Sequence, residues 1–358
     1  MQRKSLARLA AGTIVLSLAL AACSGGPGGS AAPSSGAGAG SAGSVPSSGT
    51  SAGSVPSSGA SAGSAGSAAT CTGSGDKGTV KLMINQWVGA QANVAVIECL
   101  LNQLGYKVTT NTLAEEIAWQ GFDTGEVDVI LENWGHADLE KTYIADKKVA
   151  QNAGPNGVTG IIGWYVPEWM VEKYPDILDG KNLNKYADLF KTSESGGKGQ
   201  FLGSDPTFVT NDEALVTNLK LDYKVVYSGS EAATITAFQQ ATKNKTPLIG
   251  YFYDPQWLLN TVHLKKVALP AYTTGCDADP KAVACDYPPY TLNKIVATKF
   301  VQNGGGAYTL VKNFTWTNAD QNLVADDIAN RNMSPSDAAK NWLDAHESTW
   351  KAWMPAGS

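Results

Sequence analysis

The sequence is poor in charge, in histidine and in arginine. Charged residues make up 16% of its 358 residues, and only three histidines occur. The net charge of −5 argues against a protein whose main role is to bind nucleic acid, because such proteins carry a basic excess. No histidines or cysteines have the spacing of a metal site, so we expect neither a metal nor another cofactor.

Long hydrophobic runs are also scarce, and the one near the N-terminus is typical of a secretory signal. A positively charged start precedes an apolar run at 9–22, which is too short for a comfortable membrane span. The run ends in Leu-Ala-Ala-Cys at 20–23, which resembles a bacterial lipobox. We expect residues 1–22 to be removed, which makes the mature chain three charges more negative, and Cys23 to be lipidated. An ordinary signal peptide with an incidental cysteine is the alternative.

Residues 24–75 contain no aromatic and no charged residue and consist almost wholly of Gly, Ser, Ala and Pro. The decapeptide SAGSVPSSGT at 41–50 recurs as SAGSVPSSGA at 51–60. Such a segment cannot bury apolar area, so we expect a disordered tether that reaches about 40 Å on average. Together with Cys23 it predicts a folded body held near the membrane, outside the cytoplasm, by a lipid anchor.

Four cysteines follow the expected lipidation site: Cys71, Cys99, Cys276 and Cys285. An even number outside the cytoplasm suggests two disulfides. Cys276 and Cys285 bracket the turn-rich loop GCDADPKAVAC, which a bridge would hold together. A Cys71–Cys99 bridge then follows by elimination. Free buried thiols are the alternative.

The rest of the chain alternates between strand and helix patterns. Strands are expected at 80–84, 106–110 and 127–131, with helices at 93–104 and 114–121 between them. This β-α-β-α-β order predicts a parallel sheet with right-handed crossovers. Further strands are expected at 223–227, 247–253 and 295–298, and helices at 184–190, 212–219, 231–241, 306–313, 319–330 and 335–350. Two α/β lobes with helices at the end suit a hinged ligand-binding protein.

Aromatic residues follow several of the expected strands. Trp87 follows the strand at 80–84, Trp134 follows 127–131, and Tyr251 and Tyr253 close 247–253. Parallel sheets bind ligands at this edge, and each ring attracts a quaternary ammonium by about 0.5–2 kcal/mol. The remaining tryptophans outside the motifs below are interpreted as core or surface: Trp119, Trp169, Trp257, Trp316, Trp342, Trp350 and Trp353.

A turn rich in polar residues leads into the expected helix at 212–219. Thr210 or Asn211 is a natural N-cap there, and free N–H groups at such a helix start can hold a carboxylate. The aromatic residues at the strand ends could bind a cation, and this helix start could act as an anion cradle for a carboxylate. Together they would suit a zwitterion. Simple capping without a ligand is the equally weighted alternative.

Five motifs carry a resemblance to a known family: GEVDVILENW at 125–134, GWYVP at 163–167, GSDPTFVTNDEAL at 203–215, GYFYDPQW at 250–257 and CDYPPY with NKIVATK from 285. Over about residues 77–355 the chain resembles the glycine betaine/choline-binding proteins of ABC importers. The resemblance implies an α/β, two-lobed periplasmic-binding-protein fold, type II-like, with two interlobe crossovers. Lobe I would comprise 77–160 plus 290–358, and lobe II 161–289.

The resemblance also implies an aromatic cage. Trp134 matches the family's lobe I tryptophan, and Trp87 stands where some members place a cage tryptophan. Phe208 and Tyr253 stand where other members have tryptophan. The expected cage is therefore shifted from Trp towards Phe and Tyr, and Phe208 lacks a hydrogen-bonding group.

Other site positions are implied less directly. His136 lies near the family's site histidine, although two residues closer to the tryptophan than expected, and Trp164 or Tyr165 supplies another ring. Some choline-selective members have an Asp two residues after the first cage Trp. Gly89 occupies that position here and favours a betaine-like ligand, although Glu132 could compensate.

Other classes of protein fit less well. A secreted glycosidase would need a pair of carboxylates, but the neighbours at 115–116 and 326–327 point apart on a helix and are interpreted as solvated surface. An amino-acid-binding protein would use an arginine for the α-carboxylate, and Arg331 is the only arginine in the body. A surface adhesion protein is compatible with the tether but does not require aromatic residues at strand ends.

We therefore expect a monomeric, lipid-anchored, extracytoplasmic binding protein and no enzyme. It would bind glycine betaine or a related quaternary ammonium compound and deliver it to an ABC permease in the membrane. Binding of choline, carnitine, proline or another amino acid in a modified cage is the alternative.

Overall fold

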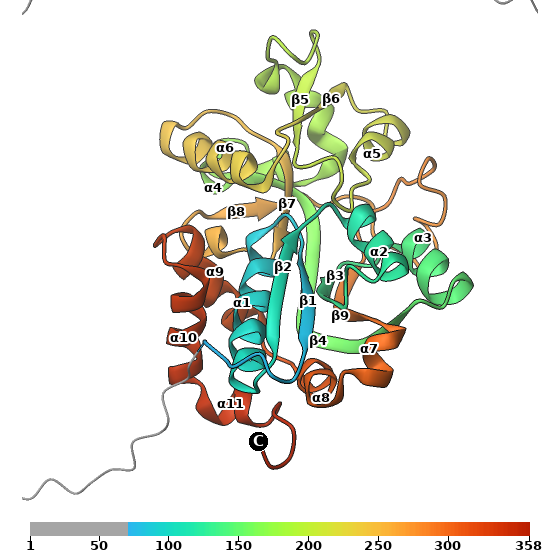
Figure 1. Ribbon diagram of the computed structural model, residues 1–358. Helices are drawn as coiled ribbons and strands as arrows, with labels where there is room; N and C mark the ends of the chain where they lie inside the picture. Colours follow the sequence, from blue (N-terminus) through green and yellow to red (C-terminus); the bar gives the residue numbers. More distant parts are fainter. Residues whose placement is uncertain (1–70) are drawn as a thin grey trace, which may run out of the picture. The chain divides into compact units, whose positions relative to one another are not determined.

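The computed structural model describes residues 71–358 (Figure 1). The expected signal peptide at 1–22, the lipidation site Cys23 and the tether up to residue 70 lie outside the described residues. The described chain forms a nine-stranded sheet with the strand order β2-β1-β3-β9-β4-β7-β5-β6, and β8 (Leu264–Lys266) pairs with β4. The mixed α/β architecture agrees with the expected fold class.

One part of the sheet is parallel and is built from the first half of the described chain. Its strands are β1 (Thr79–Ile84), β2 (Lys107–Thr112) and β3 (Val129–Asn133), joined by α1 (Val88–Gln103) and α2 (Glu115–Thr124). This confirms the parallel sheet that the β-α-β-α-β pattern predicts. We call these strands, with the helices packed on them, the β1 side.

The C-terminal helices belong to the same side. They are α7 (Thr298–Asn303), α8 (Gly305–Asn313), α9 (Asn318–Ala329), α10 (Pro335–Ala345) and α11 (Glu347–Lys351), and α8, α9 and α10 contact α1. The Ser334 hydroxyl caps α10 by accepting from the amide of Asp337, with Pro335 in the first turn, as expected. The single helix expected over 335–350 is instead two helices that meet at His346.

The other part of the sheet, which we call the β6 side, is also parallel. It contains β5 (Gly199–Gly203), β6 (Tyr223–Tyr227) and β7 (Gly250–Asp254), with α5 (Asp212–Asn218) and α6 (Glu231–Asn244). Shorter helical segments complete it: α4 (Glu168–Lys173) and the 3-10 helices at Pro175–Leu178, Gly180–Phe190 and Trp257–Asn260. Figure 1 shows these elements at the opposite end of the body from α8 and α11.

Two antiparallel strands connect the sides. The 18-residue β4 (Ala150–Pro167) pairs with β9 (Pro289–Ala297) up to Ile161 and with β7 from Ile161 onward. Its first ten residues, AQNAGPNGVT, contain Pro and Gly, which are depleted in strands, so the pattern gave no strand there. The expected lobe boundaries at 160/161 and 289/290 fall where β4 changes partner, and they stay a prediction.

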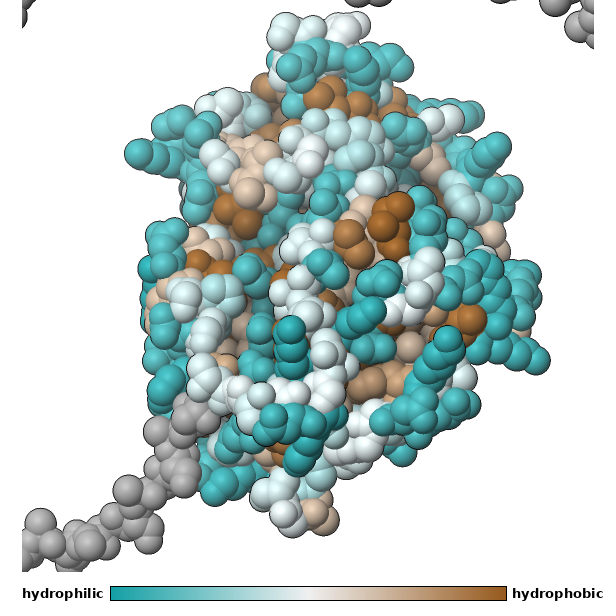
Figure 2. Space-filling model, in the orientation of Figure 1, coloured by the Kyte–Doolittle hydropathy of each residue, from teal (hydrophilic) through white to brown (hydrophobic). Residues whose placement is uncertain are grey.

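Two disulfides are present, Cys71–Cys99 and Cys276–Cys285, which is the pairing expected from the sequence. The first joins the start of the described chain to α1, whose apolar positions are almost all buried. Figure 2 shows that the face in view is mainly hydrophilic. Among the described residues, the large exposed hydrophobic side chains are Ile117, Ile161 and Leu323, so most apolar area lies in the core.

Candidate functional site

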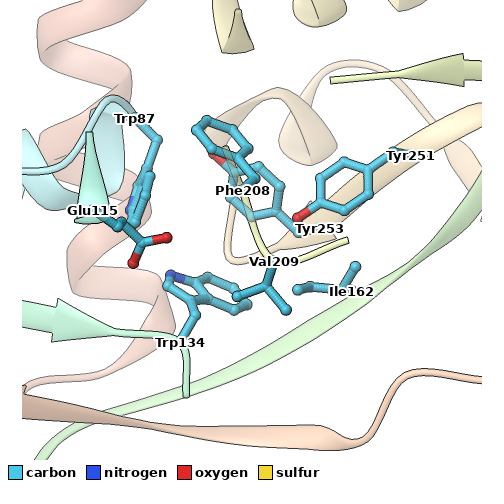
Figure 3. Close-up of a pocket in the computed structure, with 8 residues that line it drawn as sticks. All are labelled: Trp87, Glu115, Trp134, Ile162, Phe208, Val209, Tyr251 and Tyr253. Carbon is cyan, nitrogen blue, oxygen red and sulfur yellow. The ribbon is translucent and has the colours of Figure 1, made fainter. Parts of the chain in front are cut away.

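A small cavity opens between the β1 side and the β6 side (Figure 3). Its lining consists of Trp87, Glu115, Trp134, Ile162, Phe208, Val209, Tyr251 and Tyr253. About 260 Å³ of space lies empty between these side chains, the open mouth included. Its five aromatic rings suit a ligand with an apolar or softly charged surface.

Two tryptophans form the β1-side walls of the cavity. Trp87 precedes α1 and Trp134 follows β3, and both indole N–H groups donate to the same oxygen of Glu132, at 2.8 and 2.9 Å. The other oxygen of Glu132 accepts from the side chain of Asn93 at 2.6 Å. Burial raises the pKa of Glu132 to about 7 although the two indole hydrogen bonds act to lower it. One buried carboxyl group therefore orients both walls.

A close backbone approach supports one of these walls. A Cβ atom added to Gly160 on β4 would lie 2.3 Å from the ring of Trp134, closer than any side chain allows. Gly160 is therefore needed for the ring to lie this close to β4, and this contact adds a second constraint on Trp134.

The β6-side rings face the tryptophans edge to face. Phe208, after β5, lies 5.4 Å from Trp87 between ring centroids, and Tyr253, on β7, lies 5.5 Å from Trp134. Edge-to-face pairs bring the positive edge of one ring to the negative face of the other. Four of the expected cage residues thus line one cavity.

Glu231 connects the two sides next to the cavity. Its side chain accepts from the hydroxyl of Tyr253 and from the amide of Gln256 on the β6 side, the latter at 3.0 Å. It also accepts from the backbone N–H of Val88, at the start of α1, at 2.9 Å. Burial raises the pKa of Glu231. This carboxyl group therefore caps a helix of the opposite side while it holds a cavity-lining tyrosine.

Glu115 is the charged residue of the cavity lining. It is 4% exposed, accepts from Asn85 at 3.3 Å and lies 2.6 Å from Nε2 of His136. Burial acts to lower the pKa of His136, but the hydrogen bond and charge of Glu115 outweigh it, so the pKa is raised. The hydrogen bond therefore holds the Glu115 carboxyl group in a fixed position at the cavity.

Comparison with known proteins identifies the family of the chain. Residues 78–345 match the family model of the substrate-binding domain of ABC-type glycine betaine transport systems. The chain belongs to this family. The match confirms the resemblance seen in the five motifs, and the family is one of transport proteins whose binding components work outside the cytoplasm.

Individual relatives share only about a quarter of the aligned residues with this chain. The glycine betaine/carnitine transport binding protein GbuC of Listeria monocytogenes is 26% identical over 126 residues, which cover 35% of this chain and 38% of that protein. Lactococcal OpuAC, in a closed conformation with glycine betaine, is 25% identical with a TM-score of 0.62, covering 77% of this chain and 99% of that one.

Two further solved structures share the fold. A choline-binding protein of an ABC transporter, in complex with choline, is 18% identical with a TM-score of 0.63 and covers 77% of this chain and 91% of its own. The binding protein ProX of Borrelia burgdorferi is 18% identical with a TM-score of 0.64. The match covers 78% of this chain and 97% of that one. These likenesses confirm the expected two-lobed fold.

Within this family fold, two expected cage positions do not line the cavity. Trp164 is fully buried, packs on Phe201 at 4.3 Å between centroids and donates its indole N–H to Asp212 at 2.7 Å. Tyr165 is buried against Phe252. Successive residues of a strand point to opposite faces, so Tyr165 lies on the other face of β4 from Ile162, which lines the cavity. Trp164 shares the face of Ile162 but lies further along β4, where Phe201 and Asp212 hold its ring.

The expected anion cradle at α5 is largely used within the protein. The amide of Asn211 donates to the hydroxyl of Tyr287 at 2.7 Å, and the amide of Asp212 donates to the hydroxyl of Thr210 at 3.3 Å. Thr210 does not line the cavity, and His136 reaches it through Glu115. Burial raises the pKa of Asp212 to about 6.

The interpretation of the paired acids as solvated surface was wrong for one member of each pair. Glu115 is buried while Glu116 is exposed, and Asp327 is 5% exposed and lies 2.9 Å from Arg331. Because neighbours on a helix point apart, one of two adjacent acids can face the interior. The sequence pattern did not indicate which one. Ile162 and Val209 in the lining also had no sequence signal.

The described residues contain no group of His, Cys, Asp or Glu side chains arranged to hold a metal ion. Between residues 71 and 358, no helix is both long enough and apolar enough to cross a bilayer.

Proposed function

We propose that this protein binds a quaternary ammonium compound in the cage formed by Trp87, Trp134, Phe208 and Tyr253, with Tyr251 beside them. The observation that carries the proposal is the pair of indoles fixed by one buried carboxyl group and faced by rings from the other side. Ring faces attract a methylated ammonium, which offers no strong hydrogen bonds. The relatives named for glycine betaine, carnitine and choline support this ligand class.

The ligand is held between two lobes, 77–160 plus 290–358 and 161–289, that close over it. Each lobe supplies part of the cage, and the Glu231 to Val88 hydrogen bond joins them when they are closed. A ligand that contacts both lobes binds the closed form more tightly and so increases its population. The closed protein then delivers the ligand to an ABC permease as a monomer and carries out no chemistry.

The lipid anchor and the tether are part of the same proposal. Cys23 carries the lipid, and residues 24–70 separate the body from the membrane. Cys23→Ala should release the protein into the culture medium, while deletion of 24–70, which keeps Cys71 and its bridge, should leave affinity unchanged. Retention of the Cys23→Ala variant on cells would contradict the anchor.

Calorimetric titration of the purified protein with glycine betaine, choline, carnitine and proline tests the ligand class. At least one quaternary compound should bind, and proline should give no heat. Absence of heat and of thermal stabilisation with all the quaternary compounds would reject the proposed function.

A further inference from the structure

The geometry points to a cavity that selects an ammonium cation without a carboxylate group, with Glu115 as the residue that sets this selectivity. The inference rests on the proposed function and narrows its ligand class to cations such as a quaternary ammonium alcohol. It departs from the betaine-like preference that Gly89 suggested.

The first observation is the placement of Glu115. Figure 3 shows its carboxyl oxygens turned towards the space between Trp87 and Trp134. The group is 4% exposed and is held by Asn85 and His136, so it cannot easily turn away. A ligand in this cavity therefore lies beside a fixed carboxylate.

The second observation is the balance of charge around the cavity. None of the eight lining residues has a cationic side chain, and the imidazole of His136 is already paired with Glu115. Two further buried carboxyl groups lie directly behind the lining: Glu132 contacts both tryptophans, and Glu231 contacts Tyr253. The cavity therefore offers a ligand carboxylate no cationic partner, whereas each of these acidic groups attracts a positive ligand when it is ionised.

The third observation is the supply of hydrogen-bond donors. The indole N–H groups of Trp87 and Trp134 donate to Glu132, and the hydroxyl of Tyr253 donates to Glu231. Among the side chains of the lining, this leaves the hydroxyl of Tyr251 as a donor. One neutral donor beside a carboxylate acceptor suits an alcohol, which both donates and accepts, and leaves the two oxygens of a ligand carboxylate poorly satisfied.

Titration of the full-length protein in detergent with choline, tetramethylammonium and glycine betaine tests the inference. Choline and tetramethylammonium should bind at least tenfold more tightly than glycine betaine. Equal or tighter binding of glycine betaine would overturn the inference and leave the proposed function standing. No binding of any of the three would reject the proposed function itself.

Two variants then assign the selectivity to Glu115. Glu115→Gln should weaken the binding of choline at least tenfold and change the affinity for glycine betaine less than threefold. The preference for choline over glycine betaine therefore becomes smaller. Glu116→Gln, on the exposed neighbour in the same helix, should change neither and is the matched control. An equal loss for both ligands in a folded Glu115→Gln protein would mean that Glu115 only supports the cavity, and would overturn its assigned role.

Discussion

The two sides of the cavity are held in different ways. On the β1 side, Trp87 and Trp134 donate to Glu132, which also accepts from Asn93, and all four residues belong to that side. On the β6 side, Tyr253 donates to Glu231, which reaches across to the backbone of Val88. The tryptophan walls depend on partners of their own side, whereas the tyrosine wall depends partly on contact between the sides.

This difference shows how strongly each wall depends on the other side. The hydrogen bonds of the two indoles go to a residue of their own side. The hydroxyl of Tyr253 is bonded to Glu231, which also bonds across to Val88. Binding should therefore be most sensitive to changes at the tryptophans and less sensitive at Phe208 and Tyr253.

The largest effect is expected at Glu132, which holds the two tryptophans. It should appear in the free energy of unfolding. The pKa of Glu132 is raised by burial from 4.5 to about 7, so the folded state binds a proton more tightly than the unfolded state. Its contribution to stability is fully present below pH 4.5 and is lost as the pH rises through 7, by about 1.4 kcal/mol per pKa unit. Denaturation of the ligand-free protein between pH 4.5 and 8 should show this loss.

The variant Glu132→Gln should flatten that pH profile, with Glu116→Gln as the exposed control. Burial also raises the pKa of Asp212, to about 6, and of Glu231, so part of the slope will remain. A profile that Glu132→Gln leaves unchanged would contradict the assignment.

Removal of a tryptophan wall should have the next largest effect. Trp134→Ala should weaken ligand binding about 30-fold, because it removes a ring face together with its packing, at a cost of about 2 kcal/mol. Phe208→Ala on the β6 side should weaken binding about fivefold. Titration of both variants, with Trp169→Ala away from the cavity as the control, measures the comparison directly. A larger loss of affinity for Phe208→Ala than for Trp134→Ala would contradict the greater importance of the β1 side.

Displacement of the same wall should cost less than its removal. In Gly160→Ala the new Cβ atom overlaps the ring of Trp134, which must move, so affinity should fall about tenfold. The same substitution in a Trp134→Ala background should have little further effect, because the ring is already absent. Additive losses in this double-mutant cycle would show that Gly160 acts elsewhere.

The smallest effect on affinity is expected when the hydrogen bond between Tyr253 and Glu231 is removed. Tyr253→Phe keeps the ring but removes the hydroxyl that donates to Glu231, so affinity should fall about threefold. Most of this loss should appear as faster dissociation, since Tyr253 helps to position Glu231, whose bond to Val88 joins the two sides. Stopped-flow kinetics separates the two rates, and a change confined to association would argue against this role.

The sequence predicted six of the nine strands of the described chain, most helices and four residues of the cavity lining, because apolar periodicity and strand-end positions carry that information. It did not predict β4, β5 or β8. Trp87, Trp134 and Tyr253 could be placed since they follow or close buried strands. The burial of Glu115 could not be predicted, because the two acids at 115–116 look alike until the helix is packed. The exclusion of Trp164 from the lining could not be predicted either, because it depends on long-range contacts of its ring with Phe201 and Asp212.

The Cys71–Cys99 bridge also determines how the body carries mechanical load. Any pull through the chain ahead of Cys71 passes across this covalent link into the middle of α1. That helix packs against β1 and the C-terminal helices, so the force is borne by the half that holds the two tryptophans. The half with Tyr253 joins the body through β4 and lies off this path.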